Sequence, residues 1–259
     1  MARAQITIVQ SEEEEAPEGG SCAAQMREAV ERHASSDLIV FPELAMHGHK
    51  TAEWSPARIR RALASADAEA AKALDALAAR EQLSLVYGEL AEREGRLYNL
   101  ATFVSATERV SYAKTHVHWS ERFEPGDEFP VARSFPVPLG MLICFDAAFP
   151  EVPRALALAG AEVIVNISAI PASFPLKHVH RRVVACSVEN QVFTIFANRA
   201  GEGSLGGSAV VDPTGEMIAL AGETGDLTID VDLDAVRAWR EAEPLFAHRR
   251  PSLYSHIAR

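Results

Sequence analysis

The segment MLICFDAAFPE, residues 141–151, places Cys144 at the end of an almost wholly apolar run. The run LGMLICF at 139–145 predicts a buried strand, and the residues near 151–160 predict a helix that follows it. In α/β folds, binding crevices lie at the carboxyl ends of parallel strands, so Cys144 stands at a position suited to a nucleophile. Free cysteine is also among the most buried residue types, and position alone favours a structural and a catalytic role equally.

The same alternation of apolar strands and helices continues along most of the chain. Strands are expected at 5–9, 37–41, 83–90, 97–105, 108–114, 162–168 and 193–199, with further helices near 22–34, 57–80 and 177–190. After Gly201 the pattern changes to antiparallel strands joined by a turn at 213–215, and a short helix follows near 233–241. Strands this apolar need cover on both faces. We therefore expect an α/β protein in which two sheets pack face to face with helices outside, forming one domain over residues 1–259.

Composition argues against several classes of partner. The 259 residues are 48% hydrophobic and carry a formal net charge of −11, which argues against binding to nucleic acid or to an anionic membrane surface. The N-terminal apolar stretch is too short for a secretory signal, and no later segment approaches the ~20 apolar residues of a membrane span. We therefore expect a cytoplasmic protein whose partner is a small molecule.

No cofactor or metal is expected from the motifs. The sequence holds neither a phosphate-binding glycine loop, nor a dinucleotide fingerprint, nor the H-E-x-x-H of zinc hydrolases. The cysteines Cys22, Cys144 and Cys186 lack C-x-x-C spacing, and His116 and His118 lack an assignable third ligand. Cys22 and Cys186 fall inside helical patterns, where a buried structural thiol is expected.

Two charged residues stand at the ends of other predicted strands. In FPELAMHG (41–48), Glu43 follows an apolar strand, where an ionised carboxylate is costly to bury unless it meets a cation or exchanges a proton. In SYAKTH (111–116), Lys114 ends another strand. Taken alone, Lys114 is expected to extend into solvent, and it becomes useful only if it points into the same crevice.

Three motifs follow one another in a characteristic order: F-P-E at 41–43, Y-x-K-x-H at 112–116 and L-I-C-F-D at 142–146. Together they resemble the nitrilase superfamily of carbon–nitrogen hydrolases. Weaker matches, among them Tyr98-Asn99 and F-E-P-G-D at 123–127, extend the resemblance over nearly the whole chain. The resemblance implies a four-layer α-β-β-α sandwich of two mixed sheets that commonly dimerises.

The resemblance places the catalytic glutamate, lysine and cysteine of that superfamily on Glu43, Lys114 and Cys144. A thiol with an ordinary pKa of ~8.5 is mostly protonated at neutral pH and needs a base or a nearby cation to attack. Glu43 can remove the proton, while Lys114 and the backbone N–H of Phe145 hold the developing oxyanion.

A second, supporting glutamate of the superfamily lies in the loop after the lysine. It corresponds here to Glu121 or Glu124. Glu121 fits better, because it stands at a reasonable distance from Lys114 and precedes the Phe-x-Pro-Gly segment.

The expected substrate is a small amide, with a nitrile or an N-carbamoyl compound as alternatives for the same nucleophile. Superfamily members that take carboxylate-bearing substrates often have an arginine shortly after the nucleophile, where this chain has Ala147 and Ala148. We therefore expect a neutral, partly aromatic acyl pocket, unless an arginine from elsewhere reaches it; the candidates are Arg181, Arg182 and Arg199. The predicted substrate contacts are His118, Trp119, Phe149 and Ser168.

Two rival interpretations remain open. A Cys–His hydrolase would use Cys144 with His116 or His118, and it would keep most of its activity after Glu43→Gln. A non-catalytic binding module on the same fold would leave Cys144 with the reactivity of an ordinary buried cysteine. In the expected homo-oligomer, the segment 250–254 is a candidate interface tail.

Overall fold

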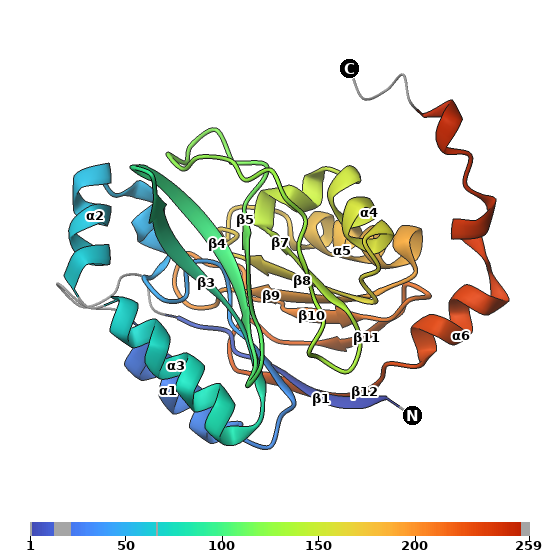
Figure 1. Cartoon of the computed structure of the whole chain (residues 1–259), viewed down its shortest axis with the longest axis horizontal. Helices are drawn as coiled ribbons and strands as arrows, with labels where there is room; N and C mark the ends of the chain where they lie inside the picture. The colour runs from blue at the N-terminus through green and yellow to red at the C-terminus, as the bar shows by residue number, and fades with distance from the viewer. Residues whose placement is uncertain (1, 13–21, 66, 255–259) are drawn as a thin grey trace.

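Two mixed sheets of six strands each form the centre of the computed structural model, which describes residues 2–12, 22–65 and 67–254 (Figure 1). The first sheet contains, in spatial order, β12 (Leu227–Asp232), β1 (Arg3–Ile8), β2 (Leu38–Val40), β3 (Ser84–Arg93), β4 (Arg96–Val104) and β5 (Arg109–Ala113). The second contains β11 (Met217–Leu220), β10 (Ala209–Val211), β9 (Phe193–Asn198), β8 (Val163–Ser168), β7 (Leu139–Ile143) and β6 (Val131–Ala132).

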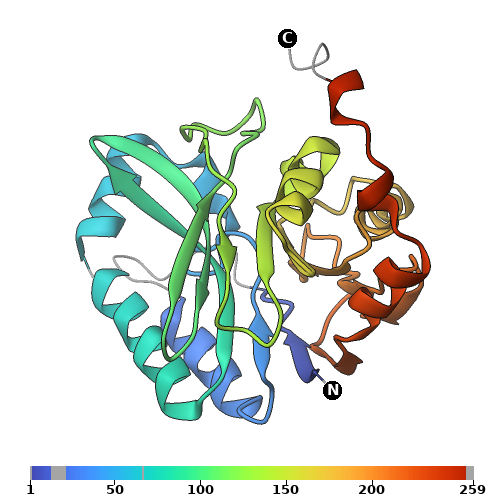
Figure 2. The ribbon, with the colours of Figure 1, turned by 45° about the vertical axis from the view of Figure 1, so that its right-hand side comes forward.

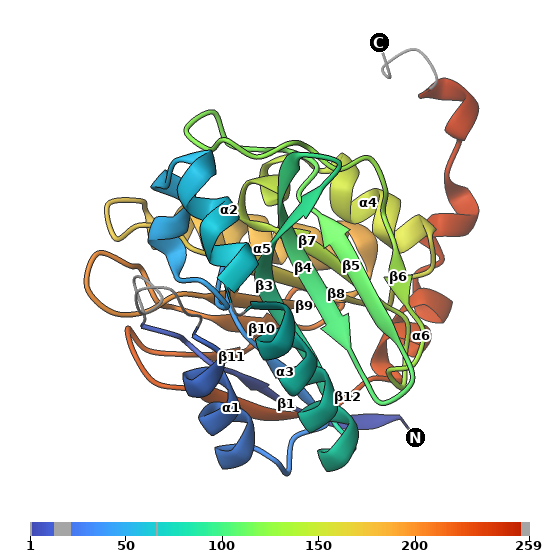
Figure 3. The same ribbon diagram turned by 60° about the vertical axis from the view of Figure 1, so that its left-hand side comes forward.

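Helices cover the outer face of each sheet. The helices are α1 (Ala23–Arg32), α2 (Pro56–Ser65), α3 (Asp67–Glu81), α4 (Glu151–Leu158), α5 (Leu176–Asn190) and α6 (Ala235–Ala242). Figure 2 shows the layers edge-on, and Figure 3 shows α1 and α3 in front of the first sheet, while α4 and α5 lie against the second. The expected α-β-β-α sandwich is confirmed. None of the helices in the described ranges is long and apolar enough to cross a membrane.

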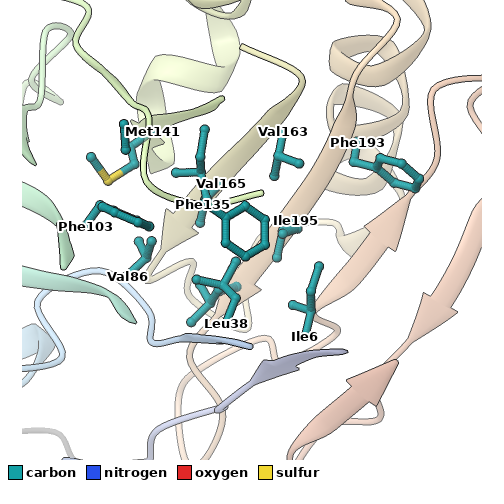
Figure 4. Close-up of a cluster of buried hydrophobic side chains, with 14 of the residues drawn as sticks. Ile6, Leu38, Val86, Phe103, Phe135, Met141, Val163, Val165, Phe193 and Ile195 are labelled. Atoms are coloured by element: carbon teal, nitrogen blue, oxygen red, sulfur yellow. The ribbon is translucent and has the colours of Figure 1, made fainter. Parts of the chain in front are cut away.

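The main core lies between the two sheets, where alternate residues of each strand meet (Figure 4). On β2, Leu38 and Val40 point into this layer, while Ile39 packs outward in the cluster that α1 and α3 share with the first sheet. On β8, Val165 belongs to the central layer and Ile164 to the cluster beneath α4. Because both faces of such strands are buried, their sequences are continuously apolar and not alternating.

The centre of each sheet is parallel and its edges are antiparallel. β1, β2 and β3 run parallel to one another, as do β7, β8 and β9. The late strand β12 returns to the first sheet and pairs antiparallel with β1, from Arg3 opposite Asp232 to Ile8 opposite Leu227. The carboxyl ends of the parallel strands of both sheets therefore lie near one another, as an α/β crevice requires.

Three local features differ from the sequence-based expectation. The strand expected at 139–145 ends at Ile143, because Cys144 has a left-handed φ of 46° and begins a 3₁₀ turn, η2 (Cys144–Ala148). The helix expected at 57–80 is divided into α2 and α3. The two-residue strand β6 was not expected, and it is too short to leave a periodic signal.

Candidate active site

Glu43 is held in a turn that follows β2 and is anchored to β3. The backbone N–H of Phe41 donates to the carbonyl of Val86 (2.8 Å), and that of Met46 donates to Gly88 (3.0 Å). Gly88 allows this close approach, because a Cβ there would lie 2.2 Å from the backbone nitrogen of Leu44. The Glu43 side chain is thereby fixed at the carboxyl edge of the first sheet, with only 3% of its surface exposed.

The buried Glu43 carboxylate accepts hydrogen bonds at both of its oxygens. Its Oε1 accepts from Asn99 Nδ2 and from Lys114 Nζ, both at 2.8 Å, and its Oε2 accepts from the backbone N–H of Ala169 at 3.1 Å. The donors come from β4, from the end of β5 and from the segment after β8. Glu43 is thus oriented by both sheets, since Asn99 and Lys114 belong to the first and Ala169 follows a strand of the second.

Lys114 joins two carboxylates. Its Nζ lies 2.8 Å from Glu43 Oε1 and 2.7 and 3.0 Å from the two oxygens of Glu121, and the residue is 1% exposed. Burial alone would lower the pKa of this lysine, but the charges of Glu43 and Glu121 and the hydrogen bond to Glu121 outweigh burial and raise its pKa. Lys114 is therefore a permanent cation at the site and does not extend into solvent.

The structure brings Glu121, and not Glu124, to this cluster. Burial and the Glu43 charge raise the pKa of Glu121, although Lys114 acts in the opposite direction. Glu124 is exposed, and its backbone N–H donates to the carbonyl of Leu97.

Cys144 stands on the η2 turn, directly after β7 of the second sheet. Burial and, to a smaller extent, the Glu43 charge raise the pKa of its thiol to about 12. Lys114 and the backbone N–H of Ala169 act in the opposite direction. The thiol is therefore protonated at neutral pH in the unliganded protein. A base must take this proton when the sulfur attacks, and Glu43 is the carboxylate that acts most strongly on it.

Asp146 fixes the turn that carries Cys144. Its Oδ2 accepts from Tyr112 Oη (2.7 Å) and from the backbone N–H of Ile143 (3.0 Å), and its Oδ1 accepts from Thr115 Oγ1 (2.9 Å) and the backbone N–H of His116 (2.8 Å). These bonds tie η2 to the end of β5 in the other sheet. This role of Asp146 and that of Asn99 were not predicted from the sequence, although both residues belong to motifs that carry the resemblance, L-I-C-F-D and Tyr98-Asn99.

A cavity of about 600 Å³ opens above these groups, within the range of small-molecule sites. Of the predicted residues, Glu43, Glu121, Cys144, Phe145, His118 and Trp119 line it. Trp119 is 82% exposed and packs on His118 at 3.8 Å between ring centroids, which places both rings at the mouth. Most of the wall is apolar, and its residues include Leu44, Ala52, Ala147, Ile170, Phe174, Val179 and Val183.

Two of the predicted substrate contacts do not line this cavity. Phe149 stacks on His116, with ring centroids 3.8 Å apart, and contacts the edge of the Phe145 ring. Ser168 is fully buried, and its hydroxyl donates to Asn166 Oδ1 (3.1 Å). Their placement suits support of the lining residues Phe145 and Asn166 more than direct contact with a ligand.

Of the three arginines considered for the pocket, one lines the cavity. Arg182 projects into the wall from α5, whereas Arg181 and the buried Arg199 do not line the cavity. The exception stated for the neutral pocket, an arginine arriving from elsewhere in the sequence, therefore applies to Arg182.

The histidines are engaged with other groups. His116 Nδ1 lies 3.1 Å from Asp146 Oδ1, and His118 Nδ1 lies 2.7 Å from Ser120 Oγ. The groups that shift the Cys144 pKa most include no histidine. Within the part of the chain that the structure describes, no group of three His, Cys, Asp or Glu side chains could hold a metal ion.

The chain is similar to several known proteins. Residues 2–241 match the family model described as carbon-nitrogen hydrolase. An (R)-stereoselective amidase from a Pseudomonas species is 32% identical over 225 residues, covering 83% of this chain and 80% of that protein. A probable nitrilase of Schizosaccharomyces pombe is 30% identical over 251 residues, covering 91% and 90%. The solved structure of a carbon–nitrogen hydrolase from Helicobacter pylori G27 is 23% identical, covers 99% of each chain and gives a TM-score of 0.85, a likeness of fold.

Proposed function

This chain belongs to the carbon–nitrogen hydrolase family, and we propose that it hydrolyses small amides to a carboxylic acid and ammonia through a thioester on Cys144. The observation that carries the proposal is the buried ammonium group of Lys114, which joins Glu43 and Glu121 beside the thiol. Burying three charged groups costs free energy. Acyl transfer uses this arrangement, because it needs a base, a cation and a nucleophile enclosed together.

The first half of the reaction forms the thioester. Glu43 takes the thiol proton as Cys144 Sγ attacks the amide carbon, and the carbonyl π electrons move to oxygen. Lys114 Nζ and the backbone N–H of Phe145 stabilise this oxyanion. When the carbon–nitrogen bond breaks, Glu43 returns the proton to the nitrogen and ammonia leaves.

The second half uses the same groups with water. Glu43 takes a proton from water, the hydroxyl attacks the thioester carbon, and the carbon–sulfur bond breaks. The carboxylic acid leaves, and the proton held by Glu43 restores the Cys144 thiol. Glu121 orients Lys114 throughout, since both of its oxygens accept from Nζ.

Amides are favoured over nitriles on two grounds. The similar Pseudomonas protein is named an amidase, and the cavity has a carboxylate, Glu43, placed to return a proton to a departing amine. A nitrile would be attacked by the same thiol to give a thioimidate, so nitriles belong in the first substrate screen.

The test is ammonia release from separate pools of neutral amides, ω-amido acids, carbamoyl compounds and nitriles. We expect release from an amide pool by the parent protein and none from Cys144→Ala. Cys186→Ala is the matched control, because that thiol is buried in α5 and does not line the cavity. Equal release by Cys144→Ala and the parent would overturn the proposal.

Glu43→Gln separates this mechanism from a Cys–His hydrolase. Glutamine keeps the size of the side chain but cannot accept the thiol proton, and general-base catalysis contributes typically ~10²–10⁴-fold. We expect a fall in kcat of that order. Retention of most activity would favour His116 or His118 as the base.

We also propose that the protein self-associates through α4, α5 and the C-terminal segment. These elements leave large apolar side chains exposed, and the segment 245–254 extends away from the sheets (Figure 1). The exposed residues are Leu158, Val188, Leu245, Leu253 and Tyr254. Exposed apolar groups that gather on one face of a protein are typical of an interface. Light scattering should give at least twice the mass of one chain, and the mass of a single chain would contradict this proposal.

A further inference from the structure

The first turns of α5 carry a concentration of positive charge. The sequence KHVHRR at 177–182 lies in a chain whose formal net charge is −11. Among the described residues, no ion pair or hydrogen bond engages the side chains of Lys177, Arg181 or Arg182.

Only one of these three cations reaches the cavity above Cys144. Arg182 is half-buried and lines the cavity wall together with two valines of the same helix. Val183 is the next residue along α5, and Val179 lies about one turn before Arg182. Phe174 and Ile170 continue this wall and offer no acceptor from their side chains. A guanidinium group in an apolar wall loses hydration without gaining a partner, so it favours a ligand with an anionic group.

The other charged groups of the cavity do not supply that partner. Glu43 and Glu121 are bound to Lys114. Glu53, at the end of η1 (His49–Glu53), also lines the cavity, but it is exposed and makes no ion pair with Arg182. Burial and the Lys114 charge lower the pKa of His118, so the ring is neutral at pH 7 and does not compete for an anion.

We propose that Arg182 binds a carboxylate of the substrate, so that the preferred substrates are amides carrying a carboxylate away from the scissile bond, such as monoamides of dicarboxylic acids. The inference rests on the proposed amidase function and specifies its substrate class. The planar guanidinium binds a carboxylate through two parallel N–H···O bonds, which also fix the distance of the substrate amide from Cys144. This proposal differs from the neutral pocket that was expected from Ala147 and Ala148, because Arg182 adds a cation to the wall.

The kinetic test compares two amides of equal chain length, glutaramate and pentanamide. We expect a higher kcat/KM for glutaramate with the parent protein. Arg182→Ala should reduce kcat/KM for glutaramate by about 10- to 100-fold, the effect of losing a hydrogen-bonded charge pair, and change that for pentanamide less than about 3-fold. Arg182→Lys should keep part of the preference, which separates binding from misfolding.

Arg181→Ala is the matched control, because it removes the same charge from the next position on α5 without touching the cavity lining. We expect its glutaramate kinetics to stay within about 2-fold of the parent at physiological salt, where charges beyond ~8 Å are screened. An equal loss of kcat/KM for glutaramate in both arginine variants would mean that the positive charge of α5 attracts the anion in general, and it would overturn specific binding by Arg182.

A binding measurement distinguishes this inference from the proposed reaction. Calorimetric titration of glutaramate into Cys144→Ala, with and without Arg182→Ala, needs no turnover. Weaker binding by at least about 10-fold in the double variant supports the carboxylate site even if no amide is hydrolysed. Unchanged binding, or a parent protein that prefers pentanamide, overturns it even if amide hydrolysis is confirmed.

Discussion

Replacing Lys114 with methionine removes the charge that joins the two buried carboxylates while keeping the length and apolar stem of the side chain. Three contacts are lost, one to Glu43 at 2.8 Å and two to Glu121 at 2.7 and 3.0 Å. Removing one partner of a buried ion pair costs about 3–5 kcal/mol, because the remaining charge is left uncompensated. We expect the free energy of unfolding at pH 8 to fall by about that amount.

The loss of stability should shrink as the pH falls. Burial and Glu43 raise the pKa of Glu121 even in the presence of Lys114, and removal of the lysine charge raises it further. A carboxyl group whose pKa is raised in the folded state binds its proton more tightly there than in the unfolded chain. As the pH falls from the pKa of Glu121 in the folded state toward its ordinary value of ~4.3, protonation of this carboxyl group therefore stabilises the folded state. The difference between Lys114→Met and the parent should be smaller at pH 5 than at pH 8.

Urea unfolding at the two pH values measures the stability, and ammonia release measures the activity. Loss of one oxyanion donor lowers kcat by about 10²–10³-fold, so the variant should be nearly inactive. Lys72→Met is the control, since that lysine pairs with Glu69 on the exposed surface and should change neither quantity appreciably. A variant that keeps more than about a tenth of the parent kcat would refute the oxyanion role, and an equal stability loss at both pH values would refute the electrostatic reasoning.

Three further outcomes follow from the same site. Asp146→Asn should lower stability by about 1–3 kcal/mol in urea unfolding, because each carboxylate oxygen accepts from a backbone N–H and either amide orientation sets an NH₂ group against one of them. A loss that is no larger than for an exposed Asp→Asn change would contradict this. Gly88→Ala should reduce kcat/KM, since its Cβ would force the Glu43 turn to move, whereas Gly222→Ala, with its nearest neighbour at 3.7 Å, should leave kcat/KM unchanged; equal effects would disprove the packing argument. Alkylation of Cys144 in the unliganded protein, followed by mass spectrometry of its peptide, should accelerate steadily from pH 7 to pH 10 without a plateau, because its pKa is raised to about 12; a plateau near pH 8.5 would indicate an unperturbed thiol.

The strands and their layering were predictable because both faces of each sheet are buried. Continuous apolar runs such as 163–168 are typical of that environment, and the structure places a strand at each run expected before Gly201. The point at which β7 ends was not predictable from apolar character, since Cys144 and Phe145 are as apolar as the strand before them. Its end depends on the left-handed backbone at Cys144, which the Asp146 hydrogen bonds hold in place.

The candidate site was predictable as a set of residue types but not as a network. The sequence pointed to Glu43, Lys114, Cys144 and Glu121; in the structure Glu43, Cys144 and Glu121 line one cavity, and Lys114 bonds to both glutamates behind it. Contacts between the two sheets, such as the hydrogen bond from the Ala169 N–H to Glu43, leave no local pattern in the sequence. The entry of Arg182 into the cavity depends on how α5 packs on the second sheet, which short-range patterns do not encode.

The return of β12 to the first sheet has a consequence for synthesis of the chain. β1 leaves the ribosome long before the strand that pairs with its free edge, Leu227–Asp232, because most of the domain lies between them in the sequence. Until then β1 presents unpaired backbone groups to other nascent chains, as any exposed edge strand does. Pairing over such a sequence separation is also slow. The first sheet should therefore depend on chaperones until β12 has been synthesised, and truncation before Leu227 should yield aggregates and not a smaller enzyme.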